Sequence, residues 1–175
     1  MNFNYTRKDL LLRLFWSFGS LIFSLTPKHF YALRHNILRL FGARIGEGSK
    51  IYPSVKITFP WNLRVGNKTC VGHNVRLYNL GQLNIGNSVT ISQGAHLCGG
   101  SHDYSKVDTA KDMPLIKSEI NVEDSVWICA DAFIGPSVTV SKKAIIGARA
   151  VVINDVPECS VYAGNPARLI KVRDD

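Results

Sequence analysis

Aliphatic side chains recur every six residues through most of the chain from residue 45 onward. They stand at Ile45, Ile51, Ile57, Val65, Val71, Leu77, Ile85, Ile91, Leu97, Val122, Ile128, Ile134, Val140, Ile146 and Val152. A small or β-branched residue usually follows four positions later, and glycine often comes directly after the aliphatic residue. A period of six fits neither an α-helix nor an alternating strand, and it is the hexapeptide signature of a parallel β-helix. Because three hexads close one triangular coil, these fifteen hexads predict about five coils, with glycine at corners whose backbone angles it tolerates.

Three intervals break this period. The spacing is eight at 57–65 and again at 77–85, which predicts two-residue bulges at the same corner of successive coils. Between Leu97 and Val122 the interval is 25 residues, so about 19 residues leave the coil at one corner. This excursion, residues 98–121, contains the sequence GGSHDY. Because loops held on a rigid scaffold often carry catalytic residues, we expect chemistry in the excursion.

Residues 1–44 differ from the repeats because they are both basic and apolar. They contain seven Lys and Arg residues and one acidic residue, a balance of +6 against +8 for the whole chain. The apolar stretch after Arg13 has about a dozen residues, whereas a transmembrane helix needs roughly 18 to 20. Between Pro27 and Gly42, apolar side chains recur at helical spacing, which predicts a second helix. These apolar residues are Phe30, Leu33, Ile37, Leu40 and Phe41.

The predicted helical hairpin allows two interpretations. In the first, it packs against the main domain or against a neighbouring subunit. In the second, it makes shallow contact with a membrane surface. A basic segment that is also apolar favours a membrane surface over nucleic acid as its partner.

The chain is therefore expected to contain a basic helical segment, residues 1–44, and a β-helix domain, residues 45–171, with the excursion at 98–121. Its 175 residues are enough for one continuous core with a small appendage. The four cysteines are scattered, with no C-x-x-C pair and no metal-ligand spacing. They are typical of reduced thiols, so we expect a cytoplasmic protein.

Several short motifs make residues 40–171 resemble the hexapeptide-repeat acyltransferases. They are LFGARIG, YNLG, GSHDY, VWI, IIGARAVV and AGNPARLIK. They are most similar to the branch that acetylates sugars in exopolysaccharide, capsule and O-antigen synthesis, as the colanic-acid-type acetyltransferases do, and the basic apolar N-terminus is also similar to that branch. The resemblance implies an all-β fold, a left-handed parallel β-helix that is an exception to the right-handed crossover rule. It also implies a homotrimer that uses acetyl-CoA and requires no metal.

The resemblance assigns the catalytic base to His102, in the family's G-[ST]-H-[DP] motif. Acetyl transfer from a thioester to an alcohol needs a base for the hydroxyl proton, and imidazole suits this role because its pKa lies near neutrality. Asp103 could orient a sugar hydroxyl, stabilise the imidazolium or cap a turn. Asn79, in YNLG, could bind the acceptor, line the site or hold a turn.

Contacts to acetyl-CoA are also implied by the resemblance, with the coenzyme in the groove between two neighbouring prisms. The candidates are Trp127, Ala130, Ala148, Asn154, Arg168 and Lys171. Trp127 would lie beside the thioester or, alternatively, pack between coils. The two alanines would make backbone contacts, although Cys129 replaces the glycine that many members have. Arg168 and Lys171 are cations suited to the nucleotide phosphates or are solvated charges, and Asn154 stands where many members have lysine.

We therefore expect an enzyme that transfers acetyl from acetyl-CoA to a sugar hydroxyl in surface polysaccharide biosynthesis, with peripheral contact at the inner membrane face. Direct transfer is favoured over an acetyl-cysteine, because no histidine pairing is visible for Cys98 or Cys129. One alternative is N-acetylation of an amino sugar. Another is a carbonic-anhydrase-like metal enzyme, for which His73, His96 and His102 are the candidates in the repeats and excursion. A non-catalytic scaffold is the third.

Overall fold

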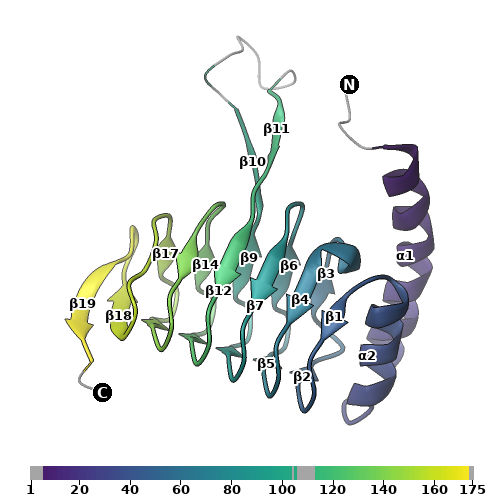
Figure 1. Cartoon of the computed structure of the whole chain (residues 1–175), viewed down its shortest axis with the longest axis horizontal. Helices are drawn as coiled ribbons and strands as arrows, with labels where there is room; N and C mark the ends of the chain where they lie inside the picture. The colour runs from purple at the N-terminus through teal and green to yellow at the C-terminus, as the bar shows by residue number, and fades with distance from the viewer. Residues whose placement is uncertain (1–5, 104, 106–112, 174–175) are drawn as a thin grey trace.

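The chain folds into an N-terminal helical hairpin followed by a parallel β-helix (Figure 1). The computed structural model describes residues 6–103, 105 and 113–173. Helix α1 (Arg7–Leu25) and helix α2 (Tyr31–Leu40) form the hairpin. Thr6 caps α1 in a capping box with Asp9, which fixes where the helix begins.

The β-helix is a prism with three faces, each built from strands of successive coils. Face A contains β1 (Arg44–Ile45), β4 (Leu63–Val65), β7 (Leu83–Ile85), β12 (Ile120–Val122) and β15 (Thr139–Val140). Face B contains β2 (Lys50–Ile51), β5 (Cys70–Val71), β8 (Thr90–Ile91), β13 (Trp127–Ile128), β16 (Ile145–Ile146), β18 (Ser160–Ala163) and the antiparallel β19 (Arg168–Val172). Face C contains β3 (Lys56–Ile57), β6 (Arg76–Tyr78), β9 (His96–Cys98), β14 (Phe133–Ile134) and β17 (Val151–Val152). These strands make five complete coils, and β18 belongs to a partial sixth.

The aliphatic hexad residues fill the inside of the prism, as predicted. All fifteen are buried, and the most exposed of them, Ile57, has an exposed fraction of 8%. Corresponding residues stack in register from coil to coil, as Ile51 does on Val71. The three breaks in the period fall at one corner, between face C and face A, where the 3-10 helix η1 (Pro60–Asn62) forms the first bulge. The predicted position of both bulges at the same corner is therefore confirmed.

The glycines that follow the aliphatic residues have a different role from the predicted one. Left-handed backbone angles occur mostly at polar residues three positions after the aliphatic residue, such as Lys68 and Ser125, with φ of 54° and 61°. Gly66 instead stacks on the next coil, because a Cβ there would lie 2.6 Å from the carbonyl carbon of Gly86. These glycines allow close stacking of the coils, and other residues take the angles of the corners.

The helical hairpin covers the N-terminal end of the prism, where each face has an edge strand with unpaired carbonyl groups. A side chain of the hairpin donates a hydrogen bond to one carbonyl oxygen on each face. The bonds run from Trp16 to Ile57, from Arg34 to Ile51 and from Arg39 to Ile45, at 2.9, 2.8 and 2.6 Å. The hairpin is therefore attached to all three faces.

Arg34 is fully buried, although it is one of the seven cations that make residues 1–44 basic. Besides its bond to Ile51, its guanidinium donates to the hydroxyl of Thr26 and to the carbonyl oxygens of Pro27 and Lys28. Burial lowers the pKa of Arg34 from its usual value. The charge is stabilised by these oxygen acceptors in the turn between the helices and at the edge of face B.

The outer surface of the hairpin is strongly apolar. Eleven of the eighteen large apolar side chains that are exposed in the described part of the chain belong to it. They are Leu10, Leu11, Leu14, Phe15, Phe18, Leu21, Ile22, Leu25, Phe30, Leu33 and Leu40. The prediction of a hairpin is confirmed, but much of its apolar pattern faces outward instead of packing on the prism. Among the described residues, no helix combines the length and hydropathy required of a membrane span.

Candidate functional site

The excursion between the third and fourth coils, predicted from the sequence as a loop, begins and ends as two antiparallel strands. Strands β10 (Gly100–His102) and β11 (Leu115–Lys117) pair in register, with His102 opposite Leu115. We call this pair of strands the arm. It projects away from the prism at the corner between face C and face A (Figure 1).

The foot of the arm, which follows β9 of the third coil, is fixed to Tyr78 of the second coil. The amide of Gly99 donates to the carbonyl oxygen of Tyr78, and the amide of Ser118 donates to the carbonyl oxygen of Gly99, both at 2.8 Å. A Cβ at Gly100 would lie 2.6 Å from the ring of Tyr78, so the strand lies directly against that ring. The arm therefore leaves the prism in a defined direction.

His102 is exposed on β10, and its ring is oriented by the residues just before the opposite strand. Its Nδ1 lies 3.1 Å from the carbonyl oxygen of Met113. A carbonyl oxygen can only accept, so the proton of the neutral imidazole is on Nδ1 and the lone pair is on Nε2. This tautomer gives His102 an unprotonated nitrogen that can accept a proton from a substrate hydroxyl.

Asp103 is positioned as a turn-capping residue. Its Oδ1 accepts hydrogen bonds from the amide and the hydroxyl of Ser105, at 3.1 and 2.5 Å. Its own amide donates to the carbonyl oxygen of Pro114 at 2.9 Å, which continues the pairing of the arm beyond His102. The structure thus gives Asp103 the capping role that was one of its three predicted alternatives.

Asn79 has the turn-holding role that was one of its three predicted alternatives. Its side chain is 1% exposed and is bonded to backbone groups of the preceding coil. The carboxamide oxygen accepts from the amides of Thr58 and Phe59, and the nitrogen donates to the carbonyl oxygen of Phe59. Asn79 therefore holds the bulged corner below the arm.

Trp127, Ala130 and Ala148 lie on the face B side of the prism. Trp127 is 48% exposed on β13 and donates from Nε1 to the hydroxyl of Ser92 at 3.1 Å, so it does not pack between coils. Ala130 and Ala148 stand one coil apart at the corner between faces B and C. The amide of Arg149 bonds to the carbonyl oxygen of Ala130 at 2.9 Å, which joins these two turns. The structure brings the two alanines together.

Asn154 and Arg168 meet at the C-terminal end of the β-helix. Both line a surface pocket of about 300 Å³, together with Tyr162 and Ala167. Lys171 lies further along β19, opposite Val161, and is exposed. Two of these three candidate coenzyme contacts therefore share one pocket, and Lys171 lies outside it.

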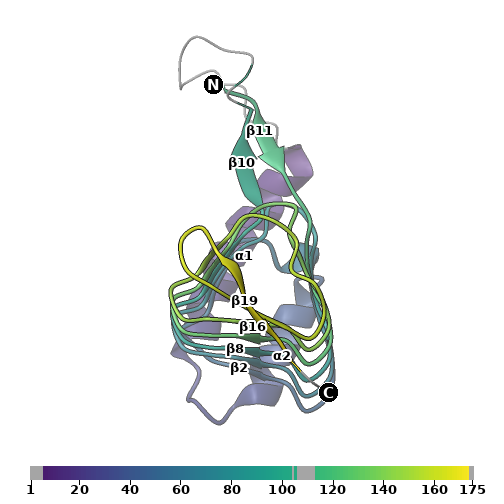
Figure 2. The same ribbon diagram turned by 90° about the vertical axis from the view of Figure 1, so that its left-hand side faces the viewer.

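The arm and Trp127 lie on opposite sides of one prism. The arm leaves at the corner between faces C and A, and in a triangular coil that corner is opposite face B, which carries Trp127. Figure 2 shows the arm rising from one end of the cross-section, with β2, β8 and β16 on the other side. A single chain therefore does not bring His102 to the predicted thioester end of the coenzyme.

A hollow that the sequence analysis missed lies on face C beside the foot of the arm. Its volume is about 390 Å³. It is lined by Lys56, Thr58, Arg76, Leu77, Tyr78, His96 and Cys98. Lys56, Arg76 and His96 are paired in register on adjacent strands. Their recurrence at one-coil intervals of 20 residues was the signal that could have revealed this surface.

The cysteines and histidines of the repeats are poorly arranged for other chemistry. All four cysteines are free, and burial raises the pKa of the Cys129 thiol, which makes it a weaker nucleophile at neutral pH. His73 packs against Tyr52, and His96 packs edge-on against Phe133. Within the described part of the chain, no three metal-ligating side chains gather at one point. The three-histidine site of the metal-enzyme alternative is therefore not formed within one chain.

Comparisons with known proteins agree with this fold. No family model matches the chain. The chain is 39% identical over 162 residues to the colanic acid biosynthesis acetyltransferase WcaF of Escherichia coli (strain K12), covering 93% of this chain and 87% of that protein. A hexapeptide-repeat-containing acetyltransferase from Vibrio cholerae, solved in complex with acetyl-CoA, superposes with a TM-score of 0.90 at 24% identity, over 99% of this chain and 93% of that one.

A galactoside acetyltransferase in complex with coenzyme A superposes with a TM-score of 0.89 at 22% identity, over 99% of this chain and 86% of that one. These structures confirm the predicted fold class, the left-handed parallel β-helix. The similarity to WcaF extends over nearly the whole chain and is high enough to show that the two proteins belong to one family. The protein is therefore a member of the hexapeptide-repeat acetyltransferase family and is related within it to a colanic acid biosynthesis acetyltransferase.

Proposed function

We propose that the protein transfers the acetyl group of acetyl-CoA to a hydroxyl of a sugar during the synthesis of a surface polysaccharide. The observation that carries this proposal is the state of His102. It is exposed on the arm, its Nδ1 is bonded to the carbonyl oxygen of Met113, and its Nε2 has a lone pair for a substrate proton. WcaF supports a saccharide acceptor, because its name places it in colanic acid biosynthesis.

In the proposed mechanism, Nε2 of His102 removes the proton of the sugar hydroxyl as the oxygen attacks the thioester carbonyl. A tetrahedral intermediate forms, and backbone amides at the edge of the prism stabilise its oxyanion. The C–S bond then breaks, the acetyl ester remains on the sugar, and the imidazolium returns its proton to the coenzyme A thiolate. Asp103, which caps the turn after His102, keeps the imidazole in position.

The proposed coenzyme site combines the face B side and the C-terminal end of the prism. Ala130 and Ala148 offer small side chains and backbone groups to the pantetheine arm, and Trp127 lies beside the thioester. Arg168, in the terminal pocket, binds the nucleotide phosphates with help from Lys171. Asn154 lies in the same pocket and supplies an amide for a hydrogen bond in place of a charge.

We also propose that the active unit is a homotrimer with a shared site. His102 and Trp127 lie on opposite sides of one prism, so the base must act on a coenzyme bound to a neighbouring copy. A cyclic arrangement satisfies this requirement, because each copy gives its arm to the next and receives one from the previous copy. Each of the three sites would then combine residues of two chains.

The proposed reaction is tested by acceptor-dependent release of thiol from acetyl-CoA, using a panel of neutral sugars, amino sugars and lipid-linked saccharides. We expect turnover with a hydroxyl acceptor and an acetyl ester that mild alkali cleaves. An alkali-stable acetamide on an amino sugar would show N-acetylation instead. Absence of both turnover and acetyl-CoA binding would favour a scaffold.

We further propose that the hairpin docks the protein on the inner face of the cell membrane. Its outer apolar side chains form a stripe along α1, and basic residues such as Arg7 and Lys28 flank it. An amphipathic helix of this kind lies in the plane of an anionic bilayer with its apolar side among the lipid chains. The four free cysteines are consistent with the reducing cytoplasm on that side of the membrane.

Charged substitutions on this stripe should release the protein from anionic vesicles. Phe18 and Ile22 are 65% and 58% exposed, so replacing both with glutamate removes apolar surface without disturbing the prism. We expect at least a tenfold loss of binding to vesicles that contain phosphatidylglycerol, measured by co-sedimentation. The matched control replaces Leu169 and Ile170, which are exposed at the opposite end, with glutamate. Equal binding by both double variants would contradict the proposal.

A further inference from the structure

Positive charge is concentrated in the half of the molecule that contains the hairpin. Residues 1–97 contain twelve Lys and Arg residues and two acidic residues, whereas residues 98–175 contain nine and eleven. Several of these cations belong to the first two coils, outside the helical segment. A ligand of the surface between the hairpin and the foot of the arm therefore meets a positive field.

Face C presents part of this charge as an ordered row. Lys56 and Arg76 are exposed and directly paired on adjacent strands, so their Cα atoms are separated by roughly one strand spacing of 4.8 Å. Like charges directly opposite one another destabilise a sheet. His96 is next in the row, and its pKa is lowered by burial and by the positive charge of Arg76. An anion bound across Lys56 and Arg76 would remove this repulsion.

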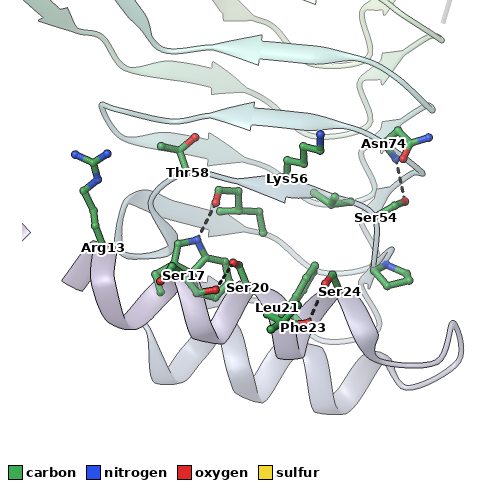
Figure 3. Close-up of a pocket in the computed structure, with 14 residues that line it drawn as sticks. Arg13, Ser17, Ser20, Leu21, Phe23, Ser24, Ser54, Lys56, Thr58 and Asn74 are labelled. Atoms are coloured by element: carbon green, nitrogen blue, oxygen red, sulfur yellow. Dashed lines mark hydrogen bonds between the residues drawn. The ribbon is translucent and has the colours of Figure 1, made fainter. Parts of the chain in front are cut away.

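The hollow beside the arm continues toward the hairpin. A groove of about 800 Å³ runs between α1 and the first coil, and Lys56 and Thr58 line both the groove and the hollow. In Figure 3, Ser17 and Ser20 stand on the side of α1 next to Lys56, on β3, and Thr58, which follows β3. The two depressions therefore adjoin at Lys56 and Thr58, and we call them together the track, from beneath α1 to the foot of the arm.

The lining of the track changes along its length. Beneath α1 it combines the apolar side chains of Phe23 and Val55 with hydroxyl groups of the helix. At its centre and toward the arm it has Lys56, Arg76 and then the ring of Tyr78. No residue that lines either described depression is acidic. This order suits a ligand with an apolar or aromatic end, a phosphate-rich middle and a sugar.

We propose that the track binds a diphosphate-linked sugar, with its phosphates on Lys56 and Arg76 and its sugar at the foot of the arm. This inference rests on the proposed acetyl transfer, because it identifies the acceptor of that reaction. The group beyond the phosphates, an isoprenoid or a nucleoside, lies in the groove beneath α1. When the phosphates are bound, the sugar lies beside Tyr78 at the end of the track nearest the arm. The arm carries His102 and begins at this end.

The test compares glucose, UDP-glucose and a short-chain prenyl diphosphate glucose as acceptors for the full-length protein. In the double variant Lys56→Gln/Arg76→Gln, we expect KM for both diphosphate-linked probes to rise about tenfold or more, because charge-assisted hydrogen bonds are lost. For glucose, which has no phosphate, the rise in KM should be much smaller than for either diphosphate-linked probe. The matched control, Lys50→Gln/Arg64→Gln, removes the same charges from the same two coils on faces B and A. A lower wild-type KM for the prenyl probe than for UDP-glucose assigns a lipid-linked acceptor, and the reverse assigns a nucleotide-linked one.

Two results would overturn the inference and leave acetyl transfer intact: an unchanged KM for the diphosphate-linked probes, or an equal rise in the control variant. A binding measurement separates this failure from failure of the proposed function. Calorimetric titration of inorganic diphosphate, without acetyl-CoA, should show binding to the wild type that the Lys56→Gln/Arg76→Gln variant loses. If no sugar is acetylated, that loss still supports the phosphate site, and the absence of binding to the wild type refutes it.

Discussion

Replacing His102 with alanine is expected to lower kcat for acetyl transfer by about 10² to 10⁴, the usual contribution of a general base. The affinity for coenzyme A should stay within about twofold, because the proposed coenzyme contacts come from face B and the C-terminal end of the prism and not from His102. Steady-state kinetics and equilibrium titration with coenzyme A measure the two quantities. Cys129→Ser is the control, because a protonated thiol has no part in direct transfer. A His102→Ala enzyme with near-normal kcat would contradict the assignment of the base.

A site built from two chains also predicts the activity of mixed trimers that contain His102→Ala and a second variant. His102→Ala lacks the base, and Ala148→Trp blocks the coenzyme corner, so each variant alone should be inactive. After the two are unfolded together and reassembled in equal amounts, random cyclic trimers should recover about one quarter of the wild-type activity, because that fraction of sites combines an intact arm with an intact corner. Recovery of no activity would contradict a site built from two chains.

Replacing Arg34 with methionine should lower the free energy of unfolding by about 3 to 5 kcal/mol. Methionine fills much of the space but donates no hydrogen bond, so the buried oxygens of Thr26, Pro27 and Ile51 lose their partner. Urea unfolding at one fixed protein concentration measures the change, because the stability of an oligomer depends on concentration.

The matched control for this substitution is Arg39→Met. Arg39 also caps a carbonyl oxygen of the first coil, that of Ile45, but its side chain is exposed and water can replace it. A loss of about 1 kcal/mol is expected there. If both variants lose the same small amount, the buried network around Arg34 is less important for stability than its burial suggests.

The β-helix could be predicted closely from the sequence because one physical constraint repeats in every coil. A narrow prism accepts an aliphatic side chain at every sixth position, so the period, the five coils and the bulged corner were all visible. The same regularity identified the excursion that carries His102. The antiparallel pairing of the arm was not visible, because Gly100 and Leu115 lie far apart in the sequence and show no pattern of their own.

The docking of the hairpin could not be predicted from helical periodicity. A stripe of apolar residues normally marks the side of a helix that packs on a core, but the pattern that includes Leu33 and Leu40 left packing and membrane contact as open alternatives. The end of a β-helix, however, presents unpaired carbonyl oxygens, and these require hydrogen-bond donors. Arg34 therefore turns inward and the apolar stripe turns outward. Likewise, the burial of Asn79 depends on a bulged corner whose shape a motif does not describe.

The three side chains of the hairpin that cap carbonyl oxygens of the first coil also affect whether the protein forms fibres. A β-helix without an end cap presents open strand edges, onto which the end of a second prism can add, so repeated addition would produce fibres. Trp16, Arg34 and Arg39 occupy the acceptors on which such growth depends. The hairpin therefore prevents end-to-end polymerisation, in addition to presenting its apolar outer surface. Removing it to obtain a more soluble repeat domain would instead promote fibre formation.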